Sequence, residues 1–142
     1  MNRKSTSGYA ITLNGNLISS QTKKQSTVSH STTEAEYKSL SDMTKEVEWL
    51  MKLMKETGIN DNLTPQLLSN KKGAIDLAQS KTDHNGFKTK HMDIKYHCIF
   101  HLLKKSIIKL NYVSTHLMAA DFLTKEVGKR IVLCSRSYLN LE

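Results

Sequence analysis

The sequence is poor in the residues that cross-link or interrupt a chain. It has two cysteines, Cys98 and Cys134, and one proline among 142 residues. Two cysteines in unrelated contexts are too few for a disulfide scaffold, which favours a reduced, intracellular protein of the cytoplasm or nucleus. No run of about 18 apolar residues occurs, and the N-terminal residues lead into no signal peptide, so we expect no membrane association. A hydrophobic content of 38%, against a globular norm of about 45–50%, indicates one domain with a lean core.

Acidic residues are outnumbered by basic ones. The chain has 21 Lys and Arg against 13 Asp and Glu, which gives a formal net charge of +8 at pH 7. A surplus of this size favours a polyanionic partner, most often nucleic acid, and a merely solvated basic surface is the alternative. The lysines that we select as candidate nucleic-acid contacts are Lys23, Lys24, Lys71, Lys72, Lys88 and Lys90.

Hydrophobic periodicity and turn signals predict an α/β domain over residues 1–127. Alternating apolar residues on both sides of Asn14 and Gly15 indicate a β-hairpin over residues 9–20. The spacing of Ser31 and Glu34 is a capping-box signal for a helix that runs to about residue 56. This order suggests one mixed sheet with flanking helices, whereas the tail, residues 128–142, stays open between strand and helix. Further signals predict strands at residues 66–69 and 107–113, and helices at residues 73–78, 89–104 and 119–125.

Two glutamates in the first predicted helix face different ways. At 100° per residue, Glu36 falls within the apolar stripe of Leu40 and Val47. Glu34 falls on the opposite, polar side with Lys38, where capping and solvation account for it. A carboxylate that faces a core costs several kcal/mol unless it is paired or binds a metal ion. Glu36 is therefore a candidate metal or catalytic carboxylate, and a partly exposed side chain at a frayed helix start is the alternative.

Five segments of the chain resemble, in the same order, the motifs of one family. They are residues 3–9 (RKSTSGY), 23–26 (KKQS), 31–37 (STTEAEY), 89–97 (TKHMDIKYH), and 112–115 with 120–125 (YVST with ADFLTK). The chain thus resembles the RNase H domain that closes the Pol polyprotein of copia-type LTR retrotransposons. The resemblance implies an RNase H-like fold and hydrolysis of the RNA strand of an RNA–DNA hybrid. It also implies a partner, the upstream reverse transcriptase region of the same polyprotein.

The resemblance further implies a metal site. Members of the family hold two Mg²⁺ ions on four carboxylates, one ion activating water and the other stabilising the leaving oxygen. Glu36 and Asp121 match two of these positions, whereas Asn70 stands at the third. The fourth lies on a first, central strand that precedes residues 3–9 in the family and is absent here. The resemblance therefore implies a truncated, degenerate copy, with impaired Mg²⁺ binding, lost hydrolytic activity and a sheet without its centre.

Three alternatives to a nuclease stay open. A catalytically inactive module could keep its affinity for RNA–DNA hybrid through the basic surface, or the chain could be an element relic without a function. A zinc site is the third, because His97 and His101 are spaced i, i+4, although the glutamate of a metalloprotease motif is missing between them. His91 and Asp93 match the family motif at residues 89–97, where they could have a structural or a substrate-binding role.

Overall fold

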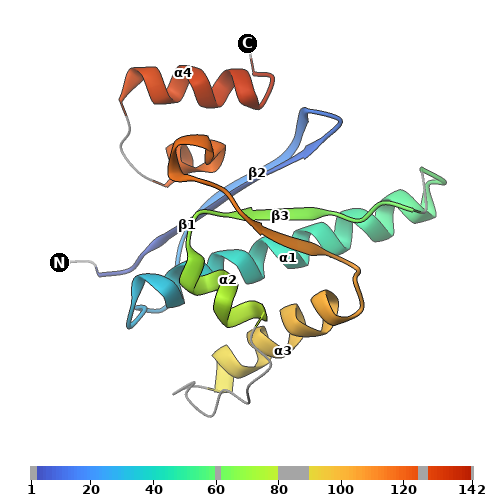
Figure 1. Ribbon diagram of the computed structural model, residues 1–142, viewed down its shortest axis with the longest axis vertical. Helices are drawn as coiled ribbons and strands as arrows, with labels where there is room; N and C mark the ends of the chain where they lie inside the picture. The colour runs from blue at the N-terminus through green and yellow to red at the C-terminus, as the bar shows by residue number, and fades with distance from the viewer. Residues whose placement is uncertain (1–2, 60–61, 80–89, 125–127, 142) are drawn as a thin grey trace.

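The first part of the chain forms the hairpin that the sequence predicts. The computed structural model describes residues 3–59, 62–79, 90–124 and 128–141 (Figure 1). Strand β1 (Thr6–Leu13) pairs antiparallel with β2 (Asn16–Lys24). Asn14 and Gly15 both have a positive φ, 51° and 79°, which is the turn geometry that matches the twist of two antiparallel strands.

Helix α1 (Thr32–Glu56) follows the hairpin. Its N-cap is Ser31, whose hydroxyl accepts a hydrogen bond from the Glu34 amide at 3.1 Å. Gly58 follows the last turn with a φ of 74°, a backbone conformation that favours glycine and ends the helix. The predicted bounds of this helix are thus confirmed to within one residue.

The second half of the chain alternates short strands and helices. Strands β3 (Gln66–Ser69) and β4 (Lys109–Tyr112) run parallel, with Leu67 opposite Leu110. The C-terminal segment, for which the sequence favours neither strand nor helix, forms a helix. Within the described ranges, no helix has the length and apolar character needed to cross a membrane. The helical elements are α2 (Lys72–Gln79), α3 (Lys90–Lys104), the 3₁₀ turns η1 (Thr115–Leu117) and η2 (Ala119–Leu123), and α4 (Lys129–Tyr138).

The strands form two separate sheets, which corrects the prediction of one mixed sheet. Within the described residues, β1 pairs only with β2, and β3 pairs only with β4. A cavity of about 320 Å³ between the two pairs is lined by Tyr9 and Ile11 of β1, Leu67 and Leu68 of β3, and Leu40 of α1. The α/β class is confirmed, but the sheet is not continuous, because no described strand fills the space between β1 and β3.

The main core lies between α1, α2, α3 and the parallel strands, on the side of α1 seen at the bottom of Figure 1. Tyr37 is fully buried, Ile99 is 1% exposed and Ile108 is 2% exposed. Each large apolar side chain contributes about 1.5–3 kcal/mol when it leaves water, so this cluster is the main source of stability. Its other buried members are Leu40, Leu67, Ile75, Ala78, Leu102 and Leu110.

The 3₁₀ turn η2 packs on the hairpin. The Thr22 hydroxyl donates a hydrogen bond to the Leu123 carbonyl oxygen at 3.0 Å. Gly8 of β1 lies at the same contact, because a Cβ atom there would be 2.5 Å from Thr124 Cγ2 and 3.2 Å from Leu123 Cβ. Glycine at this position therefore lets η2, and with it Asp121, approach the first strand.

We expect Gly8→Ala to destabilise the protein by about 1–3 kcal/mol, because the added methyl group overpacks the contact between β1 and η2. Urea-induced unfolding followed by circular dichroism measures the effect. Gly128→Ala is the matched control, since a Cβ atom there meets nothing within 4 Å, and its effect should stay within about 0.5 kcal/mol. Equal effects of the two substitutions would mean that the position of η2 does not depend on Gly8.

Candidate functional site

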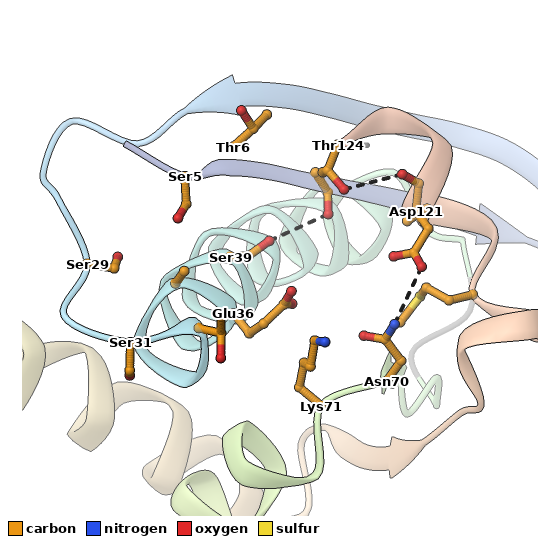
Figure 2. A pocket seen from close by; sticks show the side chains of 15 residues that line it. Ser5, Thr6, Ser29, Ser31, Glu36, Ser39, Asn70, Lys71, Asp121 and Thr124 are labelled. Atoms are coloured by element: carbon orange, nitrogen blue, oxygen red, sulfur yellow. Dashed lines mark hydrogen bonds between the residues drawn. The ribbon is translucent and has the colours of Figure 1, made fainter. Parts of the chain in front are cut away.

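Three residues that the sequence indicates lie around one cavity. Glu36 of α1, Asn70 after β3 and Asp121 of η2 line a cavity of about 500 Å³. Figure 2 shows the three side chains entering it from three different elements. The cavity lies at the carboxyl end of the parallel strand β3, which is where open α/β sheets commonly bind ligands.

Local structure fixes each of these side chains. Glu36 lies in the second turn of α1, where it is half-buried, and the Ser31 cap sets the start of that helix. Asn70 follows β3 directly and is 8% exposed. The Asp121 amide donates to the Met118 carbonyl oxygen at 3.2 Å, so the carboxylate sits on a hydrogen-bonded 3₁₀ turn. All three residues therefore lie within a helix or directly after a strand, so the secondary structure fixes their backbone positions.

The Asn70 amide contacts the Asp121 carboxylate. Its Nδ2 donates long hydrogen bonds of 3.5 Å to Asp121 Oδ2 and to Thr115 Oγ1. A neutral donor at this distance stabilises the charge on Asp121, whereas a second carboxylate would repel it. Residue 70 therefore supplies a hydrogen-bond donor to the cavity where the family resemblance implies a metal-binding carboxylate.

Lys71, which the sequence indicates as a candidate nucleic-acid contact, lines the same cavity. Figure 2 shows its ammonium group pointing into the cavity, on the side of Glu36. The neighbouring Lys72 is exposed instead, and its Nζ lies 5.1 Å from the centre of the Tyr112 ring. One feature of the sequence could have indicated that Lys71, and not Lys72, lies in the cavity. Lys71 is nearer to the carboxyl end of the predicted strand β3.

The polar side of α1 is covered near the start of the helix, which corrects the prediction that Glu34 is solvated there. Lys38 is 5% exposed, and its Nζ donates hydrogen bonds to Thr27 Oγ1 at 3.0 Å and Ser29 Oγ at 3.1 Å. It also forms an ion pair of 2.9 Å with Glu34, which accepts a hydrogen bond of 2.7 Å from the His30 amide. The chain between β2 and α1 folds back over the helix, and helical periodicity alone cannot reveal such a cover.

This network lowers the pKa of Glu34. Burial by itself raises the pKa of the carboxyl group, but hydrogen bonds from Lys38 and from the His30 amide, together with electrostatic attraction to the Lys38 and His30 side chains, outweigh it. The ionised form of Glu34 is therefore favoured in the folded protein. The negative charge of Glu34 stabilises the first turn of α1, two residues before Glu36.

The donor set of the cavity does not fit a pair of magnesium ions. Within the described residues, no three His, Cys, Asp or Glu side chains form a group that could hold a metal ion. The cavity combines two carboxylates, Glu36 and Asp121, with the amide of Asn70 and the ammonium group of Lys71. Mg²⁺ takes oxygen ligands, and two neighbouring ions need several negative charges around them. Two carboxylates with an ammonium group beside them do not supply that charge.

The other residues that the sequence indicates are spread over several elements. Lys23 and Lys24 are exposed on β2, and Lys24 is the register partner of Thr6, which lines the cavity. His97 and His101 are exposed on α3 and join no metal-ligand group among the described residues, so nothing there supports a zinc site. Lys88 lies outside the described residues, as do the side chains of Lys90, His91 and Asp93.

The fold and the cavity define an α/β protein with a polar site at the end of a parallel strand. Comparison with known proteins gives the particular relationship. The chain is 37% identical, over 134 residues, to the retrovirus-related Pol polyprotein from transposon TNT 1-94 of Nicotiana tabacum. Over 125 residues it is 35% and 34% identical to the Pol polyproteins from transposons RE1 and RE2 of Arabidopsis thaliana. The chain is therefore a homologue of retrotransposon Pol polyproteins.

The similarity covers most of this chain but a small part of each relative. The match to the TNT 1-94 polyprotein covers 94% of this chain and 10% of that protein. The matches to the RE1 and RE2 polyproteins cover 88% of this chain and 8% of those proteins. The chain thus spans about a tenth of the length of these curated relatives. No family model and no solved structure matches the chain.

We expect Glu34→Gln to lower the free energy of unfolding at pH 7 by about 1–3 kcal/mol, because it leaves the buried Lys38 without a charged partner. A carboxyl group whose pKa is lowered by folding adds stability above its unfolded pKa and loses it as the pH falls through its folded pKa. The difference between wild type and variant should therefore shrink as the pH falls into the acidic range. Urea unfolding across this range measures it, and a constant difference contradicts the assignment.

Proposed function

We propose that this chain is the RNase H-like part of a retrotransposon Pol polyprotein and that it binds RNA–DNA hybrid without cutting it. The observation that supports this most directly is the meeting of Glu36 and Asp121 at one cavity. They come from α1 and η2, and their sequence positions match two of the carboxylates that the resemblance to the family assigns to the metal site. The homology to Pol polyproteins supports the same origin.

Loss of hydrolysis is proposed from the charge of the cavity. Hydrolysis assisted by two metal ions needs one ion to activate a water molecule and another to stabilise the leaving oxygen. The cavity offers two carboxylates, and the side chains beside them, Asn70 and Lys71, are a neutral amide and a cation. These four side chains do not supply the negative charge that the two metal ions need. We therefore derive no hydrolytic step for the chain.

Binding is proposed from exposed basic residues on β2, the strand that pairs with β1. Lys23 and Lys24 are exposed and are paired in register with Ser7 and Thr6 of β1. Thr6 lines the cavity, so the end of β2 that carries the two lysines runs beside a strand that borders the cavity. Lysine contacts to phosphates are independent of sequence, and an A-like hybrid is recognised through its phosphates and 2′-hydroxyl groups. The remainder of the polyprotein, including its reverse transcriptase region, is the partner that we propose.

Binding to a fluorescently labelled RNA–DNA hybrid tests this proposal. We expect Lys23→Ala/Lys24→Ala to weaken binding at least about threefold at low salt and to reduce the salt slope by about one for each phosphate that is no longer neutralised. Lys52→Ala/Lys55→Ala is the matched control, because both lysines are exposed near the other end of α1 and the net charge is the same. Equal weakening in the two variants would contradict a binding surface at the cavity, and absence of any binding would contradict the function.

The same samples test for cleavage. After incubation with millimolar Mg²⁺, we expect the labelled RNA strand to remain intact on a denaturing gel. Cleavage that disappears in Glu36→Gln would contradict the loss of activity, because it would assign the reaction to this cavity. Cleavage that is unchanged in that variant would come from a contaminating nuclease and would leave the proposal standing.

A further inference from the structure

The residues at positions 70 and 71 supply hydrogen-bond donors and a positive charge to an otherwise acidic cavity. We infer that Asn70, through a hydrogen bond to Asp121, and Lys71, through a positive charge beside Glu36, stabilise the two carboxylates from within the chain, so that the cavity excludes divalent cations and nucleic acid binds without them. The exclusion of cations follows from the cavity alone. The metal independence of nucleic-acid binding rests in addition on the proposed function.

The first step concerns Asn70 and Asp121. Asn70 is 8% exposed, and its amide nitrogen lies 3.5 Å from Asp121 Oδ2. Two carboxylates cannot be held this close in a largely buried site unless a cation or a proton lies between them. The amide of Asn70 can lie this close to the Asp121 carboxylate without a cation, because it is neutral and donates a hydrogen bond. The 3.5 Å separation between Asn70 Nδ2 and Asp121 Oδ2 is therefore compatible with a cavity that is stable without metal.

The second step concerns the direction of Lys71. Its backbone amide donates to Ser69 Oγ at 3.2 Å, and its carbonyl oxygen accepts hydrogen bonds from the amides of Ala74 and Ile75, each at 3.2 Å. These bonds fix the backbone of Lys71 at the junction of β3 and α2, with its side chain in the cavity (Figure 2). The fold thus directs the Lys71 side chain into the cavity, where its ammonium group lies on the side of Glu36 (Figure 2).

The third step is the charge of the site. Glu36 and Asp121 contribute two negative charges to the cavity, and Lys71 returns one positive charge. A divalent ion between the two carboxylates would lie near the ammonium group of Lys71, which cannot act as a ligand, and the NH₂ group of Asn70 already donates to Asp121 Oδ2. The cost of that repulsion is large in a half-buried site, because the effective dielectric constant is well below that of water. The cavity therefore holds its carboxylates without an added cation.

Two double variants with the same composition and net charge test the exclusion of cations. Asn70→Asp/Lys71→Asn removes the ammonium group inside the cavity, whereas Asn70→Asp/Lys72→Asn removes the exposed lysine beside Tyr112. Mn²⁺ is titrated into each variant and into the wild type without nucleic acid, and free Mn²⁺ is measured by electron paramagnetic resonance. We expect the Lys71 variant to bind Mn²⁺ at least about tenfold more tightly than the other two proteins.

Two results would overturn the inference. One is a wild type that binds Mn²⁺ as tightly as Asn70→Asp/Lys71→Asn, and the other is equal affinity in the two double variants. Because a buried aspartate at position 70 can impair folding, circular dichroism accompanies each titration. If the double variants do not fold, the single variants Lys71→Asn and Lys72→Asn repeat the comparison, with the same order of affinities expected.

Measurements of hybrid binding test whether nucleic acid binds without divalent cations, which is the claim that depends on the proposed function. The dissociation constant for labelled RNA–DNA hybrid is measured with Mg²⁺ and with EDTA at matched ionic strength, and we expect the two values to agree within about twofold. Binding that tightens strongly with Mg²⁺ would contradict the inference and leave the proposed binding intact. Absence of hybrid binding in both buffers would contradict the proposed function, and the Mn²⁺ titration would still decide whether the cavity excludes cations.

Discussion

The packing of α1 between the hairpin and the helices α2 and α3 is the constraint on which the structure depends. The helix contacts β1 on one side and both α2 and α3 on the other, and no described strand links the two sheets directly. Its rotation about its own axis decides which neighbour each residue meets. Tyr37 enters the core, whereas Glu36, the preceding residue, faces the cavities between the sheets. The Ser31 cap, which sets where the helix begins, thereby sets the position of Glu36 as well.

Local elements could be predicted from the sequence because their signals lie within a few residues of one another. Asn14-Gly15 predicts the hairpin, and Ser31 with Gly58 predicts both ends of α1. The arrangement of the strands depends on contacts between distant segments, so the order of elements suggested one sheet where two are present. The same reason explains Lys38, whose side of α1 is polar in sequence but is covered by the chain that precedes the helix.

The sequence predicts the two carboxylates of the candidate site, Glu36 and Asp121, but it does not predict that Lys71 lies in the same cavity. Helical phase directs Glu36 inward, and motif positions select Asn70 and Asp121, which the fold then brings to the same cavity. Nothing in the Lys71-Lys72 doublet distinguishes an inward side chain from an outward one. The distinction arises from backbone hydrogen bonds at the junction of β3 and α2, which turn Lys71 into the cavity and leave Lys72 over Tyr112. Such directions follow from tertiary structure, since both residues have the same chemistry.

The combination of two carboxylates with an amide and an ammonium group in one cavity has a consequence for folding as well as for chemistry. Buried like charges destabilise a protein unless something neutralises them, and a metal site leaves that task to ions that come from solution. In this chain the amide of Asn70 and the ammonium group of Lys71 lie in the same cavity as Asp121 and Glu36. The cavity can therefore assemble together with the fold, without a bound ion.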